Sequence, residues 1–326
     1  MAFWRRAAQL RRWRSALLGA AEPPVRWTDS LKPFALLRSL GFLVALAGCS
    51  SYPPPTDPSY WDGATWVDDW FAVVQLDEMT WAIGEPRYLR KNVSYLITGS
   101  SRAILFDSGP GERDITPVIA SLTRLPVIHA FSHCHSDHIG NIHRFAQVAA
   151  IDLPSTRDHA ESEVFRPTVS QYTWIFPPRI TVTEWWRPGQ TIDLGGRNLL
   201  VVHVPGHTPE SIALFDRERS ELFTGDLIYA RGDLFAMSPG SSLREYLDST
   251  QRLLLMLPPS TVILGAHAAG DPRLSRDALV DLERGLHGIL DGTAAWRPGW
   301  YPPWIFPLPV RRYPSGRVVI LTHLLL

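Results

Sequence analysis

The stretch HCHSDH, at residues 133–138, carries three histidines and one aspartate within six positions. In a chain of 326 residues with 11 histidines, such a pattern arises by chance in roughly one chain in a thousand. It follows an apolar run at 127–131 that is typical of a buried strand, so a rigid element carries these side chains to the edge of a sheet. Side chains alternate along an extended chain, and His133 and His135 can therefore point the same way. Asp137 and His138 then turn toward a second position nearby.

Imidazole and carboxylate groups suit zinc, with manganese or iron as alternatives. Three more such residues follow strand-like runs. His207 comes after the run at 198–204 and a Pro-Gly turn, Asp226 comes directly after Leu-Phe-Thr-Gly, and His267 comes after the run at 261–264. Each lies where a short loop leaves a sheet. Together with the first motif they are enough for two metal sites.

This set of residues resembles the metallo-β-lactamase fold superfamily of hydrolases, over about residues 71–292. The resemblance implies an α/β (α+β) fold, a four-layer αββα sandwich with the metals at one end of its two sheets. It also implies a pair of zinc ions, with manganese or iron as alternatives. The ligands it implies are His133, His135 and His207 for the first metal, Asp137, His138 and His267 for the second, and Asp226 as the bridge between them.

The resemblance implies hydrolysis by a hydroxide that bridges the two metals. Metal ions about 3.5 to 4 Å apart can share one hydroxide, and they lower the pKa of bound water from 15.7 to about 7. Within the superfamily, the stretches HVPGHTPESIALFD (203–216), LFTGDLIY (222–229) and PGSSL (239–243) most resemble glyoxalase-II-like hydrolases, including an acyl-coenzyme A thioesterase branch. We therefore expect attack on the carbonyl of a glutathione or acyl-coenzyme A thioester, with Asp137 and Asp226 taking part in catalysis.

Tyr229 supports an alternative. Its spacing after Asp226 matches that of a tyrosine in the acyl-homoserine lactonases of this superfamily. A phenol can donate a proton to a leaving alkoxide, whereas a thiolate leaves without such help. Tyr229 is therefore a candidate catalytic group of a lactonase, unless it only packs at the end of a strand. A β-lactamase ranks below both, because zinc β-lactamases typically carry another residue at the position of Asp226. A non-catalytic metal-binding protein also ranks below, because no ligand is missing.

Other residues near the motif have narrower expected roles. Asp107 resembles the acid of the family's Asp-Thr/Ser-Gly turn, which would orient a ligand or the motif loop. Cys134 should point away from the metals by strand alternation. The aromatic residues at 172–176, Trp185 and Trp186, with Phe235 and Met237, either line an apolar acyl pocket or belong to the core.

The N-terminal segment predicts export. Residues 1–48 carry eight basic and two acidic residues and end in an apolar run, Ser39–Gly48, that is too short to span a bilayer. The ending Leu46-Ala47-Gly48 before Cys49 resembles a bacterial lipoprotein signal, which implies cleavage before Cys49, a lipid anchor on its thiol, and a membrane-anchored protein facing the periplasm. The alternative is a misassigned N-terminus, with Cys49 an ordinary thiol and the protein cytoplasmic. The Pro- and Ser-rich residues 49–70 are expected to be a tether.

Composition bounds the remaining choices. The chain is 45% hydrophobic with a formal net charge of zero, so no chain-wide basic field attracts nucleic acid, and a small ester or thioester is the expected partner. Two cysteines are too few for a disulfide framework. Residues 293–326 are rich in aromatics and proline and are expected to cap the sandwich with a hairpin, or else to contact a membrane interface. The oligomeric state is left open.

The remaining expected elements are strands at 80–83, 93–98, 103–106 and 211–215 and helices at 115–122, 242–257 and 272–290.

Overall fold

The computed structural model describes residues 63–173, 176–230, 232–268, 270–301 and 308–324. The expected leader, Cys49 and most of the expected tether lie outside these residues. No helix in the described ranges combines the length and the apolar character needed to cross a membrane.

The first sheet begins earlier than the expected domain start at residue 71, because Thr65 and Trp66 already pair with the second strand. Its central strands are buried along their whole length, as in Ala103–Phe106, because both faces of the sheet are covered. In spatial order, its described strands are β1 (Thr65–Trp66), β2 (Ala72–Asp77), β3 (Thr80–Gly84), β4 (Val93–Thr98), β5 (Ala103–Phe106), β6 (Val127–Ala130), β7 (Val148–Ile151) and β11 (Glu184–Trp186).

The second sheet contains the strands that precede the three later ligand candidates. Its middle strands β15 and β17 run parallel, so their carboxyl ends lie at the same edge. In spatial order, its described strands are β12 (Thr191–Asp193), β13 (Asn198–His203), β14 (Ile212–Asp216), β15 (Glu221–Gly225), β17 (Val262–Gly265) and β18 (Arg273–Ser275).

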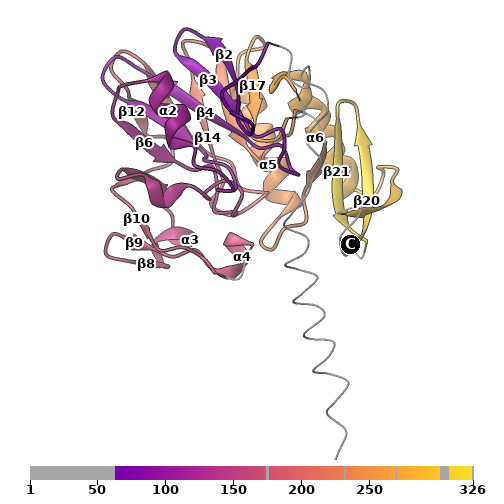
Figure 1. Cartoon of the computed structure of the whole chain (residues 1–326). Coiled ribbons are helices and arrows are strands. Elements are labelled where there is room, and N and C mark those ends of the chain that lie inside the picture. The colour runs from indigo at the N-terminus through magenta and orange to yellow at the C-terminus, as the bar shows by residue number, and fades with distance from the viewer. Residues whose placement is uncertain (1–62, 174–175, 231, 269, 302–307, 325–326) are drawn as a thin grey trace, which may run out of the picture. The chain divides into compact units, whose positions relative to one another are not determined.

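The layers follow from which apolar clusters each sheet joins. One core lies between the two sheets, where Tyr95 of β4 packs edge-on against Phe223 of β15 at 5.1 Å between ring centroids. Helix α2 (Thr116–Leu122) packs on the outer face of the first sheet. Helices α5 (Leu243–Met256) and α6 (Asp277–Leu290) pack on the outer face of the second, as Figure 1 shows. The expected four-layer αββα sandwich is confirmed.

Two smaller sheets extend this sandwich. One, near α3 (Pro154–Arg157) and α4 (Val169–Tyr172), consists of β10 (Ile180–Thr181), β9 (Val164–Phe165) and β8 (Ala160–Glu161). The other, the C-terminal sheet, has the order β16 (Asp233–Phe235), β21 (Val318–His323), β20 (Leu308–Ser315) and β19 (Arg297–Tyr301). Tyr313 and Ile320 of this sheet share an apolar cluster with Leu286 of α6. The C-terminal segment therefore packs on the sandwich and adds strands to β16.

The expected elements match the structure closely in the interior and less well at their ends. The strands at 93–98 and 103–106 have the expected bounds. The helix expected from residue 272 begins at Asp277, because Arg273–Ser275 pairs with β17 as an edge strand. The expected hairpin forms from Leu308 to His323, with longer strands than predicted.

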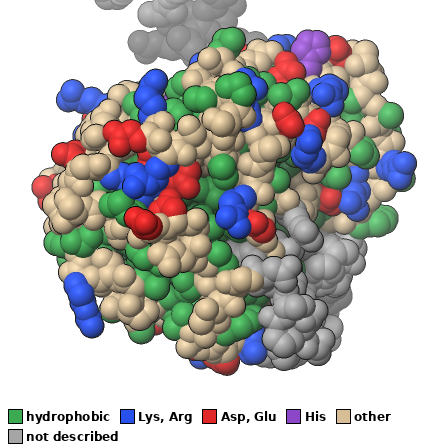
Figure 2. All heavy atoms as spheres, turned by 90° about the horizontal axis from the view of Figure 1, so that it is seen from above, with side chains coloured by type: hydrophobic (Ala, Val, Ile, Leu, Met, Phe, Trp, Pro, Cys, Tyr) green, Lys and Arg blue, Asp and Glu red, His purple; other side chains and the backbone are tan. Residues whose placement is uncertain are grey.

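Charges are mixed on the outer surface. On the face drawn in Figure 2, Lys and Arg side chains lie among Asp and Glu side chains, with apolar side chains between them. Neighbouring charges of opposite sign cancel at a distance, and this face therefore presents no extended field of one sign.

A buried arginine ties the two sheets together. Arg197 is fully buried beside β13, and its Nε donates to Asp216 Oδ2 of β14 at 2.7 Å. Its Nη1 donates to the carbonyl of Met79 at 2.8 Å, and its Nη2 donates to Thr80 Oγ1 of β3 at 2.9 Å. A guanidinium out of water is stable only when its donors are paired and its charge is balanced.

We predict that Asp216→Asn lowers the free energy of unfolding by about 3 to 5 kcal/mol, because it leaves the buried Arg197 with a weaker countercharge. Urea unfolding followed by circular dichroism measures this change. The control is Asp152→Asn, which breaks the more exposed pair with Arg157 (2.6 Å) and should cost less than about 1 kcal/mol. Equal, small effects for both variants would contradict the structural role of Arg197.

Candidate metal centre

All seven predicted ligands lie at the ends of strands and come together. The HCHSDH motif follows β6, His207 lies in the loop after β13, Asp226 directly follows β15, and His267 follows β17. Their ligand-type atoms form two groups, in each of which the atoms lie within 4.8 Å of one another. The first group is His133, His135, His207 and Asp226, and the second is Asp137, His138 and His267.

Asp226 contacts both groups. Its Oδ2 lies 3.3 Å from His207 Nε2. Its Oδ1 lies 3.1 Å from His267 Nε2 and 3.3 Å from His138 Nε2. One carboxylate thus places an oxygen beside each group, which is the arrangement that the expected bridging role requires.

Hydrogen bonds to Nδ1 fix the orientation of most of the imidazole rings. When one nitrogen of a histidine binds a metal, the other usually donates to a carbonyl or carboxylate, which sets the orientation of the ring. Four of the five histidines follow this pattern through Nδ1. The partners are Ser132 Oγ for His133 (3.0 Å), Asp107 Oδ2 for His138 (3.0 Å), the Phe235 carbonyl for His207 (3.0 Å) and the Arg90 carbonyl for His267 (2.9 Å).

The opposite nitrogens are buried without partners. Among the described residues, Nε2 of His133, His135, His138 and His267 and Oδ1 of Asp226 form no hydrogen bond, although Asp226 Oδ1 lies 3.1 Å from His267 Nε2 and 3.3 Å from His138 Nε2. Leaving a buried polar atom unpaired costs roughly 1 to 3 kcal/mol, and several such atoms facing one another point to a cation between them. Imidazole nitrogens with carboxylate oxygens are the donor set of a zinc site. The residues present therefore fit a pair of divalent ions.

The protonation states of most of these ligands suit metal binding. His138 is the exception: burial opposes its protonation, but the carboxylates of Asp226, Asp107 and Asp137 outweigh burial and raise its pKa well above the usual value, so an ion would displace a proton there. Burial lowers the pKa of His133 and His135 well below its usual value and that of His207 to about 4, so these rings are neutral at pH 7. Burial opposes ionisation of Asp137, but the Arg90 guanidinium and the neighbouring histidines outweigh it and lower the pKa of this carboxyl. Neutral imidazoles and ionised carboxylates are the forms that bind metal.

Asp107 supports the motif from below, as the resemblance implied. Its Oδ1 accepts from the backbone N–H of Ser132 at 2.7 Å, and its Oδ2 accepts from Ser132 Oγ at 2.9 Å and from His138 Nδ1 at 3.0 Å. The backbone of Asp107 has a φ of +64°, a strained conformation for a residue with a side chain. This backbone conformation points the carboxylate of Asp107 toward Ser132 and His138.

A glycine lets β15 approach the motif. Gly225 has a φ of +55°, and a Cβ there would lie 2.3 Å from Ser132 Cβ. Any larger residue would push Asp226 away from the histidines. A glycine is therefore required before Asp226 for steric reasons, in addition to the requirement for a metal-binding aspartate at position 226.

Several supporting residues were not predicted from the sequence. Asn92 Nδ2 donates to the Asp137 carbonyl at 2.6 Å, and Arg90 Nη1 lies 3.5 Å from Asp137 Oδ2. Tyr246 of α5 donates its hydroxyl to the Asp226 carbonyl at 2.6 Å. Arg90 and Asn92 lie in the loop before β4 and Tyr246 lies on a helix, so no motif or spacing connects them with the ligands.

Tyr229 lies directly beside the cluster of ligand candidates, whereas Cys134 does not contact it. The Tyr229 hydroxyl donates to Asp226 Oδ2 at 2.7 Å, and its ring packs edge-on against His267 at 4.6 Å. Burial and the Asp226 carboxylate raise the pKa of this phenol well above its usual value, so it remains protonated. Cys134 is buried in an apolar cluster with Phe131 and Ile139, in agreement with its predicted orientation.

A cavity of about 1010 Å³ opens beside the first group of ligands. Its lining includes His135, Arg90, Phe235 and residues of α4 such as Val169. Of the aromatic residues expected either in a pocket wall or in the core, Phe235 lines this cavity. Trp186 belongs to the core between the two sheets, because β11 continues the first sheet through β7.

The other pocket candidates are divided. In the segment at 172–176, the non-aromatic Thr173 lines the cavity, and residues 174 and 175 lie outside the described residues. Tyr172 and Trp185 pack against the apolar cluster of Cys134. Arg157 also lies over the Trp185 ring, 3.8 Å from its centroid. Met237 packs against Val310 in a separate apolar cluster. The cavity wall is therefore less aromatic than the sequence suggested.

Comparison with known proteins gives consistent matches. The family model of the metallo-beta-lactamase superfamily matches residues 87–267. The acyl-coenzyme A thioesterase MBLAC2 of Gallus gallus is 30% identical over 211 residues, covering 57% of this chain and 76% of that protein. The hydroxyacylglutathione hydrolase GloC of Haemophilus influenzae is 23% identical over 184 residues, covering 55% and 86%. The metallo-beta-lactamase structure from Pontibacter korlensis has the same fold, with a TM-score of 0.53, 17% identity, and 67% and 99% coverage.

We predict that Asp107→Asn weakens zinc binding by roughly 10- to 100-fold. The amide keeps the shape of the side chain, but its N–H₂ can then face His138 Nδ1–H, so the ring loses its acceptor. Competition with a chromogenic chelator measures the affinity. Asp114→Asn is the control, because Asp114 pairs with Arg144 on the surface. Unchanged zinc affinity in Asp107→Asn would contradict the supporting role of this carboxylate.

Proposed function

The chain belongs to the metallo-β-lactamase superfamily and is a metal-dependent hydrolase, and we propose that it is a dinuclear zinc enzyme that hydrolyses thioesters of the acyl-coenzyme A or glutathione type. The observation that carries this proposal is the convergence of seven buried ligand-type side chains beside a large cavity. His135 belongs to the first group of ligands and also lines the cavity, so a substrate in the cavity lies next to the centre.

The chain's own residues prepare the site for hydrolysis. When bound, two zinc ions supply an ionised water near neutral pH and polarise a carbonyl. His133, His135 and His207 are neutral before any ion binds, because burial lowers their pKa. Asp226 lies against both groups and can hold two ions together at a fixed spacing. In the overall reaction, water adds to the carbonyl carbon and the carbon–sulfur bond breaks, giving a carboxylic acid and a thiol.

Arg90 is placed to orient the substrate. Its guanidinium lies 5.8 Å from the centroid of the Phe235 ring at the cavity wall and 3.5 Å from Asp137 Oδ2. A cation at this position attracts the carbonyl oxygen, on which negative charge builds up during the reaction. The backbone carbonyl of Arg90 also accepts from His267 Nδ1, so this residue couples the ligand cluster to the cavity.

The thioester class is supported by the relatives and by the cavity. Two of the similar proteins are named as hydrolases of acyl-coenzyme A or of hydroxyacylglutathione, both of which are thioesters. The cavity wall combines the apolar side chains of Val169 and Phe235 with the hydroxyls of Thr168 and Ser170. A wall of this kind accepts an acyl chain and leaves hydrogen-bonding groups for a polar thiol carrier.

One contact favours lactone hydrolysis as a second candidate function. Tyr229 has its hydroxyl 2.7 Å from Asp226 and its ring against His267, so the phenol borders the proposed reaction centre. A protonated phenol at this position can donate to a leaving alkoxide. It would add little to the departure of a thiolate.

We predict chelator-sensitive release of thiol from at least one member of a panel of lactoyl-glutathione and acyl-coenzyme A substrates of increasing chain length. Asp226→Asn should lower turnover by at least about 100-fold, because it weakens the contact with both groups of ligands. Asp248→Asn, on the exposed face of α5, is the control. A zinc-loaded protein that hydrolyses no thioester would contradict the proposal.

The role of Tyr229 separates the two candidate reactions. We expect Tyr229→Phe to keep thioester turnover within about threefold of wild type, because a thiolate leaves without a proton donor. If the protein is a lactonase, the same variant should lower turnover of acyl-homoserine lactones by about 100-fold. Parallel assays of both substrate classes measure the difference. A large loss on thioesters would contradict the proposed leaving-group argument.

A further inference from the structure

The C-terminal sheet connects the cavity to a pair of arginines. Phe235 of β16 lines the cavity and lies directly opposite Leu321 of β21. Leu321 lies opposite Arg312 of β20, and Arg312 lies opposite Arg297 of β19. Residues directly opposite one another in neighbouring strands project from the same face. We call the side of the sheet from which Phe235, Leu321, Arg312 and Arg297 project the Phe235 face.

The two arginines repel each other. Like charges directly opposite one another in a sheet are destabilising. Arg312 Nη2 donates to Asp233 Oδ1 at 2.8 Å, but within the described ranges Arg297 has no hydrogen bond or ion pair. A Cβ at Gly299 would lie 2.7 Å from Arg312 Cδ, so the stem of Arg312 lies over the β19 backbone, on the strand of Arg297. One carboxylate thus faces two guanidinium groups, and an added anion would balance the second.

The surrounding sequence strengthens this positive charge. Residues 293–326 contain four arginines and no aspartate or glutamate. Residues 49–292, in contrast, contain 20 basic and 30 acidic residues. A basic segment on an acidic domain attracts an anionic ligand to one place. Guanidinium groups bind phosphate with two parallel hydrogen bonds, which makes arginine the preferred residue for this ligand.

The spacing from the cavity suits an extended substrate. Neighbouring strands lie about 4.8 Å apart, so Arg312 and Arg297 lie about 10 and 14 Å from Phe235 across the sheet. Apolar side chains lie in between: Val310 and Leu321 form a cluster with Tyr301, whose ring packs at 4.8 Å from that of Phe235. A substrate can therefore have its reacting bond at the cavity and an anionic group at the arginines, with an uncharged arm along the apolar cluster.

We propose that Arg297 and Arg312 bind the phosphate groups of the thiol carrier, so that the substrate is a thioester of a phosphorylated nucleotide carrier of the coenzyme A type. This inference rests on the proposed thioester hydrolysis and selects between its two substrate classes. Glutathione carries carboxylates close to its thiol and no phosphate, and it is too short to reach from the cavity to both arginines.

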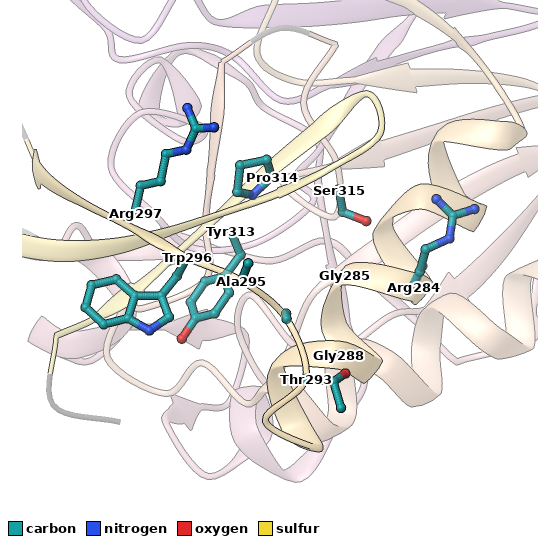
Figure 3. A pocket seen from close by; sticks show the side chains of 11 residues that line it. Arg284, Gly285, Gly288, Thr293, Ala295, Trp296, Arg297, Tyr313, Pro314 and Ser315 are labelled. Carbon is teal, nitrogen blue, oxygen red and sulfur yellow. The ribbon is translucent and has the colours of Figure 1, made fainter.

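The opposite face of the same sheet supplies a matched control. A pocket of about 400 Å³ lies there between α6 and β20, and its lining includes Trp296, Tyr313 and Arg284. Arg297 also borders this pocket, but its side chain leaves the strand on the other side from Trp296, as Figure 3 shows. Arg311 belongs to this opposite face and lies over the Trp296 ring, 4.9 Å from its centroid. It is adjacent to Arg312 in the chain and has the same charge, but it points away from the Phe235 face.

The kinetic test compares an acyl-coenzyme A with the same acyl group on pantetheine, which lacks the nucleotide and its phosphates. For the coenzyme A substrate, we expect Arg297→Gln and Arg312→Gln each to raise KM by about 10-fold with little change in kcat. For the pantetheine substrate, KM should stay the same, and Arg311→Gln should behave as wild type on both. Equal effects on the two substrates, or no effect on either, would overturn the proposal.

A binding test keeps the inference separate from the proposed activity. Equilibrium dialysis of adenosine 3′,5′-bisphosphate with the zinc-loaded full chain should show binding that weakens about 10-fold in Arg297→Gln. Asp233→Asn should tighten it, because this change removes the competing carboxylate. Inorganic phosphate and vesicles of anionic phospholipid distinguish other sources of phosphate. If Arg297→Gln abolishes vesicle binding and leaves nucleotide binding unchanged, the arginines recognise lipid headgroups and the proposal is wrong.

Failure of the proposed function has a different signature. A wild-type protein that hydrolyses no thioester but binds the nucleotide through Arg297 would refute thioester hydrolysis and retain the phosphate site. A protein that hydrolyses both thioesters with the same KM and binds no nucleotide would retain the function and refute the site.

Discussion

The structure depends on a set of buried imidazole and carboxylate groups that satisfy one another only in part. Nε2 of His133, His138 and His267 faces inward without a partner in the described part of the chain, while the Nδ1 atoms of these rings are held by other residues. Burying such groups is costly unless something completes them. A pair of cations would do so, and Asp226 contacts both groups of ligands. The fold thus supplies most of the free energy of orientation before any ion binds.

Rigid elements place each of these groups. The ligands follow the ends of β6, β13, β15 and β17, of which β6, β15 and β17 are buried over most of their length. Two local features complete the geometry: the strained backbone of Asp107, which directs its carboxylate under the motif, and Gly225, which allows β15 to approach Ser132. The C-terminal sheet also contributes, because β16 provides the carbonyl of Phe235 that holds His207. The segment that caps the sandwich therefore supports the metal centre indirectly, because β21 pairs with β16.

The sequence predicted what local patterns encode. The spacing in HCHSDH and the polar residues after apolar runs were enough to name all seven ligand candidates, because side-chain alternation and strand ends are local properties. The layers of the sandwich came from the family resemblance, since periodicity does not show which sheets pack together. Arg90 and Tyr246 were missed because they reach the centre through tertiary contacts. The sequence left Trp186 open between core and pocket, because a tryptophan has the same sequence pattern in both, and the structure places it in the core.

The protein thus combines seven converging ligand-type side chains, a cavity beside them, and two arginines that we propose bind the phosphates of a long thioester. The proposed chemistry depends on the seven side chains holding two metal ions. Anomalous diffraction at the zinc absorption edge, from crystals of the zinc-loaded protein, tests this claim most directly. The account predicts two peaks, one among His133, His135 and His207 and one among Asp137, His138 and His267, with Asp226 between them. A single peak, or none at these residues, would contradict it.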